Sequence, residues 1–502
     1  MHTALLLDMM ADAAPDRLAL GRRRDGLTFH EVRRRAHHAA EWLQGKGAGT
    51  VVFLGLNGTA LPIALFAAGM LAKPFAPLNY RLPDADLQKL LARTAPSVAI
   101  VDDDMAGRIG KPAGVAVVTR SEFEIACNAS GHSDAQFDED HDIGVLLFTS
   151  GTTGEPKAAI LRHRNLTSYV ISTVEFLASE EDEAALVSVP PYHIAGVSAI
   201  LTGVYSGRRI VHLDTFTPET WVATAAEEAI THAMVVPTML GRILDVLEKT
   251  GESLPKLKAI SYGGGRMPLP VIERAMRLLP HVGFANAYGL TETSSTISIL
   301  GPEDHWEAVR SSDPEVRRRL GSVGKPLPFL DVEIRGPHGE VLPPGQSGEV
   351  YVRGDQVSGE YAGKTLVDGE GWFATNDGGW MDADGYLFLE GRLDDVIVRG
   401  GENISPGEIE DVLRAHPAVA DVAVFGTPDK EWGETVAAVV VPKDARPSTD
   451  DLAGWVRARL RSTKTPEVWA FREALPYNDT GKLLRRQLKA EFSGPAKQPA
   501  SA

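Results

Sequence analysis

The feature that most constrains the fold is a regular alternation of strand-like and helix-like apolar segments along the first part of the chain. Residues 50–56, TVVFLGL, have the continuous apolar character of a buried strand, and residues 61–72 that of a buried helix. An amphipathic helix at 86–94 and another strand at 97–103 follow. Parallel strands need a crossover connection, usually a helix, so this rhythm predicts α/β layers with parallel sheet. The same rhythm predicts further strands at 185–190, 207–214, 232–238 and 257–265.

The pattern of the chain changes twice towards the C-terminus. After about residue 320 it becomes turn-rich β, as in GEVLPPGQSGEVYVRG at 339–354, where alternating apolar residues are punctuated by Gly and Pro. Near residue 395 a small α+β pattern begins, and its first helix starts at Ser405 and Pro406. The remaining elements expected there are strands at 419–426 and 435–442 and a helix at 449–461.

These changes predict the domain organisation of the chain. Its 502 residues and 43% hydrophobic content are enough for two or three domains with sizeable cores. We expect an N-terminal domain over 1–393, a small C-terminal domain over 394–490 and a disordered tail over 491–502.

Composition also limits the class of partner and the compartment. A net charge of −16 argues against binding to bulk nucleic acid or to an acidic membrane, although it allows an anion in one local pocket. The single cysteine, Cys127, excludes an internal disulfide framework and a multi-cysteine zinc site. The N-terminal apolar run lacks a basic start and is interrupted by Asp8 and Asp12, and no transmembrane stretch follows. A soluble cytoplasmic protein is therefore expected.

The stretch LLFTSGTTGEPKAA at 146–159 has the composition of an anion-binding loop. Gly151 and Gly154 allow close approach of a ligand to backbone, hydroxyls and N–H groups supply donors, and Lys157 adds a charge. The order differs from the common nucleotide motif, which has Gly, four residues and then Gly-Lys-Ser/Thr. These residues predict phosphate binding, with an ordinary polar loop as the alternative.

Other polar stretches indicate nucleotide and metal chemistry. Glu292, beside the hydroxyls of ANAYGLTETSS at 285–295, is a candidate Mg²⁺ ligand, or else a surface carboxylate in a polar turn. Asp377 and Arg392 could accept from and donate to ribose hydroxyls, or form an ordinary surface ion pair. Lys482 follows an Asn-Asp-Thr-Gly turn and is either a catalytic cation or a solvated loop lysine.

Taken in order, these stretches resemble the adenylate-forming superfamily, and within it the acyl-CoA synthetase and fatty acid–CoA ligase branch. The resemblance runs from LTFHEV at 27–32 to Lys482, and rests on TSGTTGEPK, YGLTET, GWFATND with GRLDD, GGENISPGEIED and NDTGK. It implies a large N-terminal adenylation domain of layered α/β subdomains with a small β-barrel-like part, and a small mobile α+β C-terminal domain. ATP, Mg²⁺ and coenzyme A are the implied cofactors.

The resemblance assigns roles to residues at the matching positions. Lys482, Glu292, Thr149, Lys157 and His193 are the implied catalytic residues, and Glu292 and Thr149 the implied metal ligands. Asp377 and Arg392 would clamp the ribose, Asp394 would be the hinge, and Gly400 and Gly401 would let the CoA thiol pass. The remaining implied nucleotide contacts are Thr149, Ser150, Gly151, Thr152, Thr153, Gly154, Lys157, Gly263, Gly264, Gly265, Asn286, Ala287, Tyr288, Gly289 and Thr291.

The implied reaction has two halves. A carboxylate attacks the α-phosphate of ATP and releases pyrophosphate, while Lys482, Mg²⁺ and the loop donors stabilise charge on the phosphorus oxygens. The small domain then rotates at Asp394 and withdraws Lys482, and CoA takes the acyl group as a thioester.

The segment VSVPPYHIAGVSAI at 187–200 indicates which class of carboxylic acid is the substrate. His193 matches a wall or gate residue of the family, or else it is a core histidine. The residues after it include no Asp or Asn, which members of the family that activate amino acids or salicylate-type acids carry in this segment. The resemblance therefore favours an uncharged hydrophobic acid. We expect a medium- or long-chain fatty acid, with an aryl acid as the alternative. The implied pocket comprises mostly small residues, which core packing explains equally well: His193, Gly196, Val197, Val236, Gly263, Gly264 and Ala287.

The resemblance leaves open which molecule accepts the acyl group. No extra insertion is apparent between 300 and 391, which favours CoA over an acyl carrier protein. A luciferase-like oxygenase and a catalytically silent nucleotide-binding protein are the remaining alternatives, and relatives suggest a homodimer. The chain departs from the family pattern at Asn376, Arg266 and Ala158, and none of these changes removes a charged catalytic group.

Overall fold

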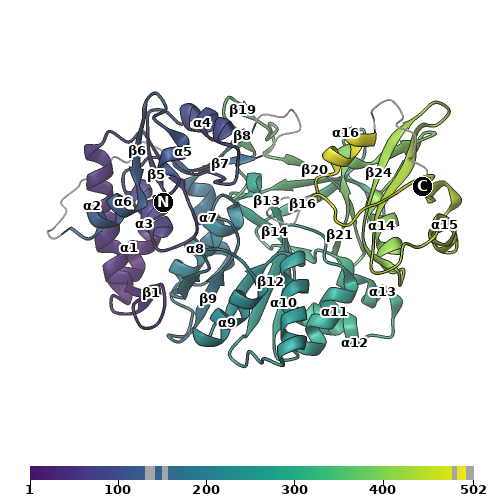
Figure 1. Ribbon diagram of the computed structural model, residues 1–502, viewed down its shortest axis with the longest axis horizontal. Coiled ribbons are helices and arrows are strands. Elements are labelled where there is room, and N and C mark those ends of the chain that lie inside the picture. The colour runs from purple at the N-terminus through teal and green to yellow at the C-terminus, as the bar shows by residue number, and fades with distance from the viewer. Residues whose placement is uncertain (130–141, 150–155, 478–482, 493–502) are drawn as a thin grey trace.

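The computed structural model describes residues 1–129, 142–149, 156–477 and 483–492. Figure 1 shows a large N-terminal part of layered helices and sheets, drawn in purple to green, and a smaller yellow-green C-terminal part beside it. In the described residues no helix is long and apolar enough to cross a membrane.

One large sheet carries the flanks of the predicted phosphate loop. Its order is β19-β18-β8-β7-β4-β3-β5-β6, and its middle strands run parallel, as the alternating sequence predicts. Strands β7 and β8 pair antiparallel at one side of this parallel block. The bounds are β3 (Thr50–Leu54), β4 (Phe75–Pro77), β5 (Ser97–Val101), β6 (Val115–Thr119), β7 (Ile143–Thr149), β8 (Lys157–Arg162), β18 (Glu360–Tyr361) and β19 (Lys364–Thr365).

A second large sheet carries predicted nucleotide contacts, among them Gly263 and Asn286. Its order is β15-β14-β13-β12-β11-β9-β10-β1-β2, and β10, β9, β11, β12 and β13 run parallel. The bounds are β1 (Leu18–Leu20), β2 (Leu27–Thr28), β9 (Ala184–Val187), β10 (Arg209–His212), β11 (His232–Val235), β12 (Ala259–Gly263), β13 (Gly283–Leu290), β14 (Ser295–Leu300) and β15 (Lys325–Pro326).

Helices cover these sheets and bury the apolar cores between them (Figure 1). Helix α2 shows why they begin where they do, since Thr28 and Glu31 form a reciprocal capping box at its first turn. The bounds are α1 (Ala4–Ala13), α2 (Phe29–Gly45), α3 (Ala60–Met70), α4 (Asp84–Arg93), α5 (Ala106–Ile109), α6 (Arg120–Cys127), α7 (His163–Thr173), α8 (Ile194–Ser206), α9 (Pro218–Glu227), α10 (Pro237–Thr250), α11 (Leu269–Leu278), α12 (Pro302–Arg310), α13 (Pro314–Arg318), and the 3₁₀ helices η1 (Thr291–Thr293) and η2 (Arg319–Gly321).

The turn-rich β region forms a small antiparallel sheet of order β16-β17-β20-β21. Its residues Val352 and Phe373 pack against Ile297 of β14, so this sheet is joined to the N-terminal part through an apolar core. The bounds are β16 (Asp331–Arg335), β17 (Gly348–Arg353), β20 (Phe373–Met381) and β21 (Leu387–Arg392).

The C-terminal part has its own sheet, of order β23-β22-β25-β24 with β26 paired to β25. Helix α16 extends to Phe492, whose ring lies 5.3 Å from that of Phe425, so residues 491 and 492 belong to this domain and not to the predicted tail. The bounds are η3 (Leu393–Asp395), β22 (Ile397–Arg399), β23 (Glu402–Ile404), α14 (Pro406–Arg414), β24 (Val419–Asp429), β25 (Gly433–Pro442), α15 (Thr449–Arg457), η4 (Ser462–Lys464), β26 (Val468–Phe471) and α16 (Arg485–Phe492).

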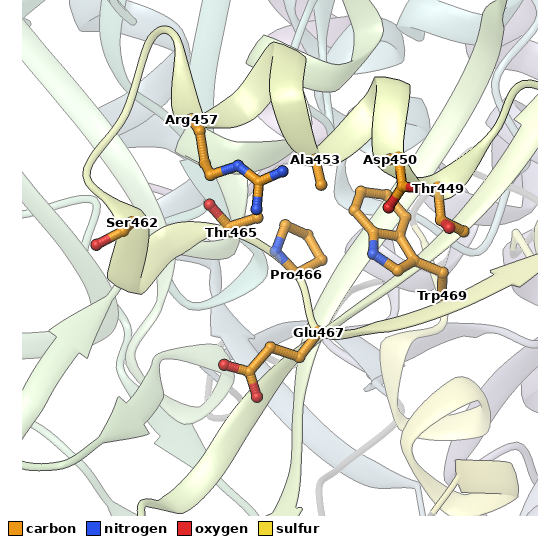
Figure 2. A pocket seen from close by; sticks show the side chains of 9 residues that line it. All are labelled: Thr449, Asp450, Ala453, Arg457, Ser462, Thr465, Pro466, Glu467 and Trp469. Carbon is orange, nitrogen blue, oxygen red and sulfur yellow. The ribbon is translucent and has the colours of Figure 1, made fainter.

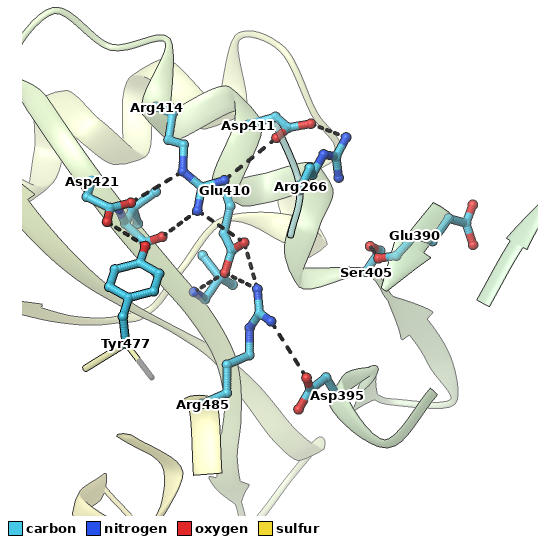
Figure 3. Close-up of polar contacts among 12 residues, drawn as sticks. Arg266, Glu390, Asp395, Ser405, Glu410, Asp411, Arg414, Asp421, Tyr477 and Arg485 are labelled. Atoms are coloured by element: carbon cyan, nitrogen blue, oxygen red, sulfur yellow. Dashed lines mark hydrogen bonds and ion pairs between the residues drawn. The ribbon is translucent and has the colours of Figure 1, made fainter. Parts of the chain in front are cut away.

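Polar contacts join the C-terminal part to the rest of the chain. Arg266, which follows the Gly263–Gly265 run, forms an ion pair with Asp411 of α14. The Ser405 hydroxyl donates to the backbone carbonyl of Glu390 at 2.6 Å. Arg266 is one of the departures from the family pattern noted in the sequence, and in the structure it contacts the small domain (Figure 3).

A buried histidine gives the fold a predicted pH dependence. His163 is 2% exposed, its Nδ1 accepts a hydrogen bond from the Thr3 amide at 3.3 Å, and burial lowers its pKa to about 4. The unfolded chain therefore binds a proton that the folded chain does not, and stability contributed by this site falls as pH drops below about 6.5 towards 4. The loss between pH 7 and 4.5 should be about 2–3 kcal/mol.

Urea unfolding of the wild type and of His163→Asn at both pH values checks this expectation. The variant should lose less stability on acidification than the wild type, because it has no imidazole to protonate. The matched control is His30→Asn on α2, an exposed position, which should retain the wild-type pH dependence. An equal pH dependence in all three proteins would contradict the prediction.

Candidate active site

The ends of the predicted phosphate loop lie side by side. Thr149 at the end of β7 pairs with Lys157 at the start of β8, and the Thr149 hydroxyl lies 3.4 Å from the Lys157 carbonyl oxygen. Lys157 is exposed. The intervening predicted contacts lie outside the described residues: Ser150, Gly151, Thr152, Thr153 and Gly154.

Glu292 is held by the segment that leads into β18. Its backbone carbonyl accepts hydrogen bonds from the amides of Ser358 at 2.8 Å and Gly359 at 3.0 Å. Its carboxylate accepts a hydrogen bond from the Tyr361 hydroxyl. Burial and the neighbouring Glu292 charge raise the pKa of Tyr361, against an opposing hydrogen bond with Thr149. Thr149 and Glu292, which are far apart in sequence, therefore meet at one tyrosine.

This donor set suits a magnesium ion bound to a nucleotide. One carboxylate, one hydroxyl and phosphate oxygens are the oxygen ligands that Mg²⁺ favours. Glu292 and Thr149 would hold the ion, which when bound would neutralise charge on the transferring phosphate. Sequence reasoning missed Tyr361, because nothing in VSGEYAGK marks it apart from its place between two glycines.

Asp377 and Arg392 are cross-strand partners on β20 and β21. Arg392 Nε lies 3.1 Å from Asp377 Oδ1, and the Tyr288 hydroxyl donates to Asp377 Oδ2 at 2.6 Å. Arg392 Nη1 also donates to the Thr375 carbonyl at 2.7 Å. Burial first, and then the Asp377 charge, raise the pKa of Tyr288, so its hydroxyl stays protonated and remains a donor. These contacts fix the position of the Asp377 carboxylate, to which the resemblance assigns binding of the ribose.

The glycines among the predicted nucleotide contacts allow close approach of two backbones. Gly263 on β12 pairs with Ala287 on β13, and a Cβ at Gly263 would lie 2.3 Å from the Ala287 carbonyl oxygen. Gly264 has φ +77°, and a Cβ there would lie 3.7 Å from Val236. Gly264 and Gly265 are exposed, so this turn offers bare backbone beside β13.

The end of β13 carries the rest of the predicted nucleotide contacts. The Asn286 side-chain amide donates to the Ser322 carbonyl at 3.0 Å, so it supports the loop after η2. A Cβ at Gly289 would lie 1.7 Å from the Ser295 carbonyl oxygen, which explains glycine there. Thr291 begins η1, directly before Glu292.

The residues of the predicted acyl pocket are divided between a helix start and two cores. His193 is the residue before α8, and its ring lies 4.8 Å from that of Tyr192. A Cβ at Gly196 would lie 3.1 Å from the Pro190 carbonyl oxygen. Val197 and Val236 are 2% and 5% exposed and belong to different hydrophobic cores, so both have packing roles.

The predicted hinge makes a contact that the sequence did not suggest. Asn376, which has φ +60°, donates from its side chain to Asp394 Oδ2 at 2.8 Å. Gly400 and Gly401 form the turn between β22 and β23, with φ +57° and +83°, the geometry of a tight hairpin. Lys482 lies outside the described residues.

A cavity of about 370 Å³ lies elsewhere, between α15, η4 and β26 (Figure 2). Arg457, Thr465 and Trp469 are among the residues that line it. Every residue of its lining comes from positions 449–469, so it contains none of the predicted site residues.

Comparison with known proteins identifies the family. Residues 7–362 match the model of the AMP-binding enzyme family, and residues 408–482 match that of the AMP-binding enzyme C-terminal domain. The chain belongs to the AMP-binding enzyme family. This confirms the resemblance seen in the sequence and the predicted α/β fold with a small C-terminal domain.

Relatives and solved structures of this family cover almost the whole chain. Feruloyl-CoA synthase of Amycolatopsis sp is 33% identical over 482 residues, 93% of this chain and 94% of the relative. A fatty acid–[acyl-carrier-protein] ligase of Streptomyces coeruleorubidus is 31% identical over 490 residues, 93% of this chain and 92% of the relative.

Among solved structures, o-succinylbenzoate CoA synthetase of Bacillus subtilis with an acyl-adenylate intermediate has a TM-score of 0.84 and 29% identity, covering 96% of this chain and 97% of that one. The same enzyme with ATP and magnesium ion has a TM-score of 0.83 at 29% identity, covering 96% and 99%. These comparisons confirm the predicted class, an AMP-forming acid–thiol ligase that uses ATP, Mg²⁺ and coenzyme A.

The Tyr288–Asp377 hydrogen bond yields a test of the ribose clamp. Tyr288→Phe removes the donor that orients Asp377, so the KM for ATP should rise about tenfold with a smaller change in kcat, as expected for a hydrogen bond to a charged group. Steady-state pyrophosphate release measures both constants. Tyr351→Phe on β17 is the control and should leave the KM for ATP unchanged. A rise in the KM for the acid alone would contradict the assignment.

Proposed function

We propose that this enzyme activates an aromatic carboxylic acid and transfers it to coenzyme A. The observation that carries the choice of acid is a set of hydroxyls beside the predicted acyl pocket. Ser198 of α8 lies 3.4 Å from Ser295 of β14 between hydroxyl oxygens. The Tyr169 hydroxyl of α7 lies 3.3 Å from that of Thr296. These four residues are called the hydroxyl seam below.

The hydroxyl seam lies close to the residues assigned to the acid. Ser198 directly follows Val197, just after the first turn of α8. Ser295 and Thr296 pair with Leu290 and Gly289 of the YGLTET motif. These hydroxyls bond to one another in the structure, and a ring hydroxyl or methoxy group could exchange hydrogen bonds with them, which an alkyl chain could not do. The relatedness to feruloyl-CoA synthase supports the same choice.

A fatty acid, which the sequence alone favours, is the second candidate. The relative that joins a fatty acid to an acyl carrier protein favours it, and also keeps a carrier protein as the alternative acceptor. The homodimer and the cytoplasmic location stay predictions from the sequence.

In the first half-reaction we assign charge stabilisation to this chain's own groups. An oxygen of the substrate carboxylate forms a bond to the α-phosphorus of ATP as the bond to pyrophosphate breaks. Lys482, with Lys157 and the loop donors, would stabilise the negative charge that gathers on the phosphorus oxygens. Asp377 and Arg392 would hold the ribose, so that the α-phosphate is fixed relative to Glu292.

In the second half-reaction the thiol sulfur of CoA forms a bond to the acyl carbon, the thiol proton is lost, and AMP leaves. We assign Gly400 and Gly401 to the passage of the thiol, after rotation at Asp394. Asn376 would release Asp394 in that rotation, because their hydrogen bond joins residues on either side of the moving segment.

A panel of acids tests the proposed substrate class. Ferulate, benzoate, decanoate and palmitate are supplied with ATP, with and without CoA, and pyrophosphate, AMP and thioester are measured. We expect the highest kcat/KM for the hydroxylated aromatic acid. Ser198→Ala should lower its kcat/KM about three- to tenfold, the value of one hydrogen bond, and leave that for benzoate unchanged.

The matched control is Ser206→Ala, at the far end of α8, where the hydroxyl donates to the Gly203 carbonyl of the same helix at 3.3 Å. It should leave the preference among acids unchanged. A preference for decanoate or palmitate that Ser198→Ala does not alter would overturn the aromatic proposal and support the fatty acid.

A further inference from the structure

Segment 478–482, which includes Lys482, lies outside the described residues, but the residues on either side of it are paired. Tyr477 and Leu483 form an antiparallel bridge, and this pair is called the base of the lysine loop below. The Leu484 amide also donates to the Pro476 carbonyl at 2.9 Å. Lys482 is bonded directly to Leu483, so whatever fixes this base limits where the lysine can reach.

A buried carboxylate binds one side of the loop base. Arg485, three positions after Lys482, places Nη2 2.7 Å from both carboxylate oxygens of Glu410 on α14. Glu410 is 3% exposed, and its carboxylate also accepts a hydrogen bond from the Val424 amide of β24 at 2.9 Å. A carboxylate so buried needs its partners, so Arg485 has a strongly preferred position (Figure 3).

The other side of the base enters the same network. The Tyr477 hydroxyl donates to Asp421 Oδ2 at 2.6 Å, and burial followed by the Asp421 charge raises the pKa of that tyrosine. Arg414 lies between the two anchors, 3.4 Å from Asp421 and 3.5 Å from Glu410. Figure 3 shows this arginine between the two carboxylates. Both ends of the loop are therefore bound to one cluster of charges.

The network also reaches the segment that follows the predicted hinge. Arg485 Nη1 lies 3.6 Å from Asp395, and Lys489 Nζ lies 3.7 Å from the same carboxylate. Asp395 directly follows Asp394. The base of the lysine loop and the first turn of the C-terminal domain are thus held by the same arginine.

We propose that Arg485 and Glu410 are positioning residues for the adenylation half-reaction. They fix the base of the loop so that Lys482 reaches the α-phosphate when the small domain is docked. The inference rests on the proposed role of Lys482. Neither residue touches the reacting atoms; both act through the lysine. A displacement of about 1 Å at a catalytic group can cost about 100-fold in rate, so a small shift of the base matters.

The variant Arg485→Lys keeps the charge but replaces the planar guanidinium by a point charge on a different stem. We expect the rate of pyrophosphate release to fall about 10- to 100-fold, while thioester formation from supplied acyl-AMP and CoA stays within about twofold. Glu410→Gln should do the same. The matched control is Arg472→Lys, whose partner Glu491 lies at the far end of α16, and it should leave both half-reactions unchanged.

A double variant separates positioning from general damage to the domain. Lys482→Ala should abolish most adenylation and spare thioester formation. In that background Arg485→Lys should cause no further loss, because the residue through which it acts is gone. Equal losses in both half-reactions, or a full further loss in the double variant, would overturn the inference.

Failure of the proposed function gives a different result. If Lys482→Ala retains wild-type adenylation, the assigned role of the lysine is wrong and the inference falls with it. If Lys482→Ala abolishes adenylation and Arg485→Lys has no effect, only the inference is wrong. Thermal melting of each variant confirms that these outcomes come from folded protein.

Discussion

Two hydrogen bonds from tyrosines to carboxylates hold together the strand ends that carry the predicted nucleotide site. Tyr288 on β13 donates to Asp377 of the small antiparallel sheet, and Tyr361 of β18 donates to Glu292 just beyond β13. The end of β13 therefore connects three sheets whose residues are far apart in sequence. Neither carboxylate could keep its position relative to the other if this strand end were displaced, and the predicted ribose and metal roles depend on that relation.

The sequence predicted elements well where the pattern is local. The strand expected at 50–56 is Thr50–Leu54, and the helix expected at 61–72 is Ala60–Met70. The resemblance assigns Gly263 to the nucleotide, and the structure adds a packing reason for glycine there, because a Cβ would lie 2.3 Å from the Ala287 carbonyl oxygen. Such features depend on a few neighbouring residues or on one strand pair, and the sequence carries both.

Contacts between distant elements could not be predicted in the same way. Tyr361 stands in a short turn-rich segment, and its partner Glu292 is 69 residues away. Arg485 and Glu410 are 75 residues apart, and nothing in either stretch identifies the other. Asn376 was noted only as a departure from the family pattern, and its contact with Asp394 depends on the packing of β20 against η3. Each of these pairs is set by tertiary structure.

The net negative charge of the chain opposes the binding of a negatively charged nucleotide. A protein of net charge −16 must bind a polyanionic nucleotide, so it needs local cations and buried donors. We assign this role to Lys157 and Arg392, and Arg392 already forms an ion pair with the Asp377 carboxylate. Fixed partners of this kind reduce the reorganisation required when the nucleotide binds.

A crystal structure with a nonhydrolysable acyl-adenylate analogue would show whether the strand end at β13 organises the nucleotide site. The ribose hydroxyls should contact Asp377, and the adenine should lie along the backbone of Gly264 and Gly265. A ribose bound away from Asp377 and Arg392, with the Tyr288 contact unchanged, would contradict this role of the strand end.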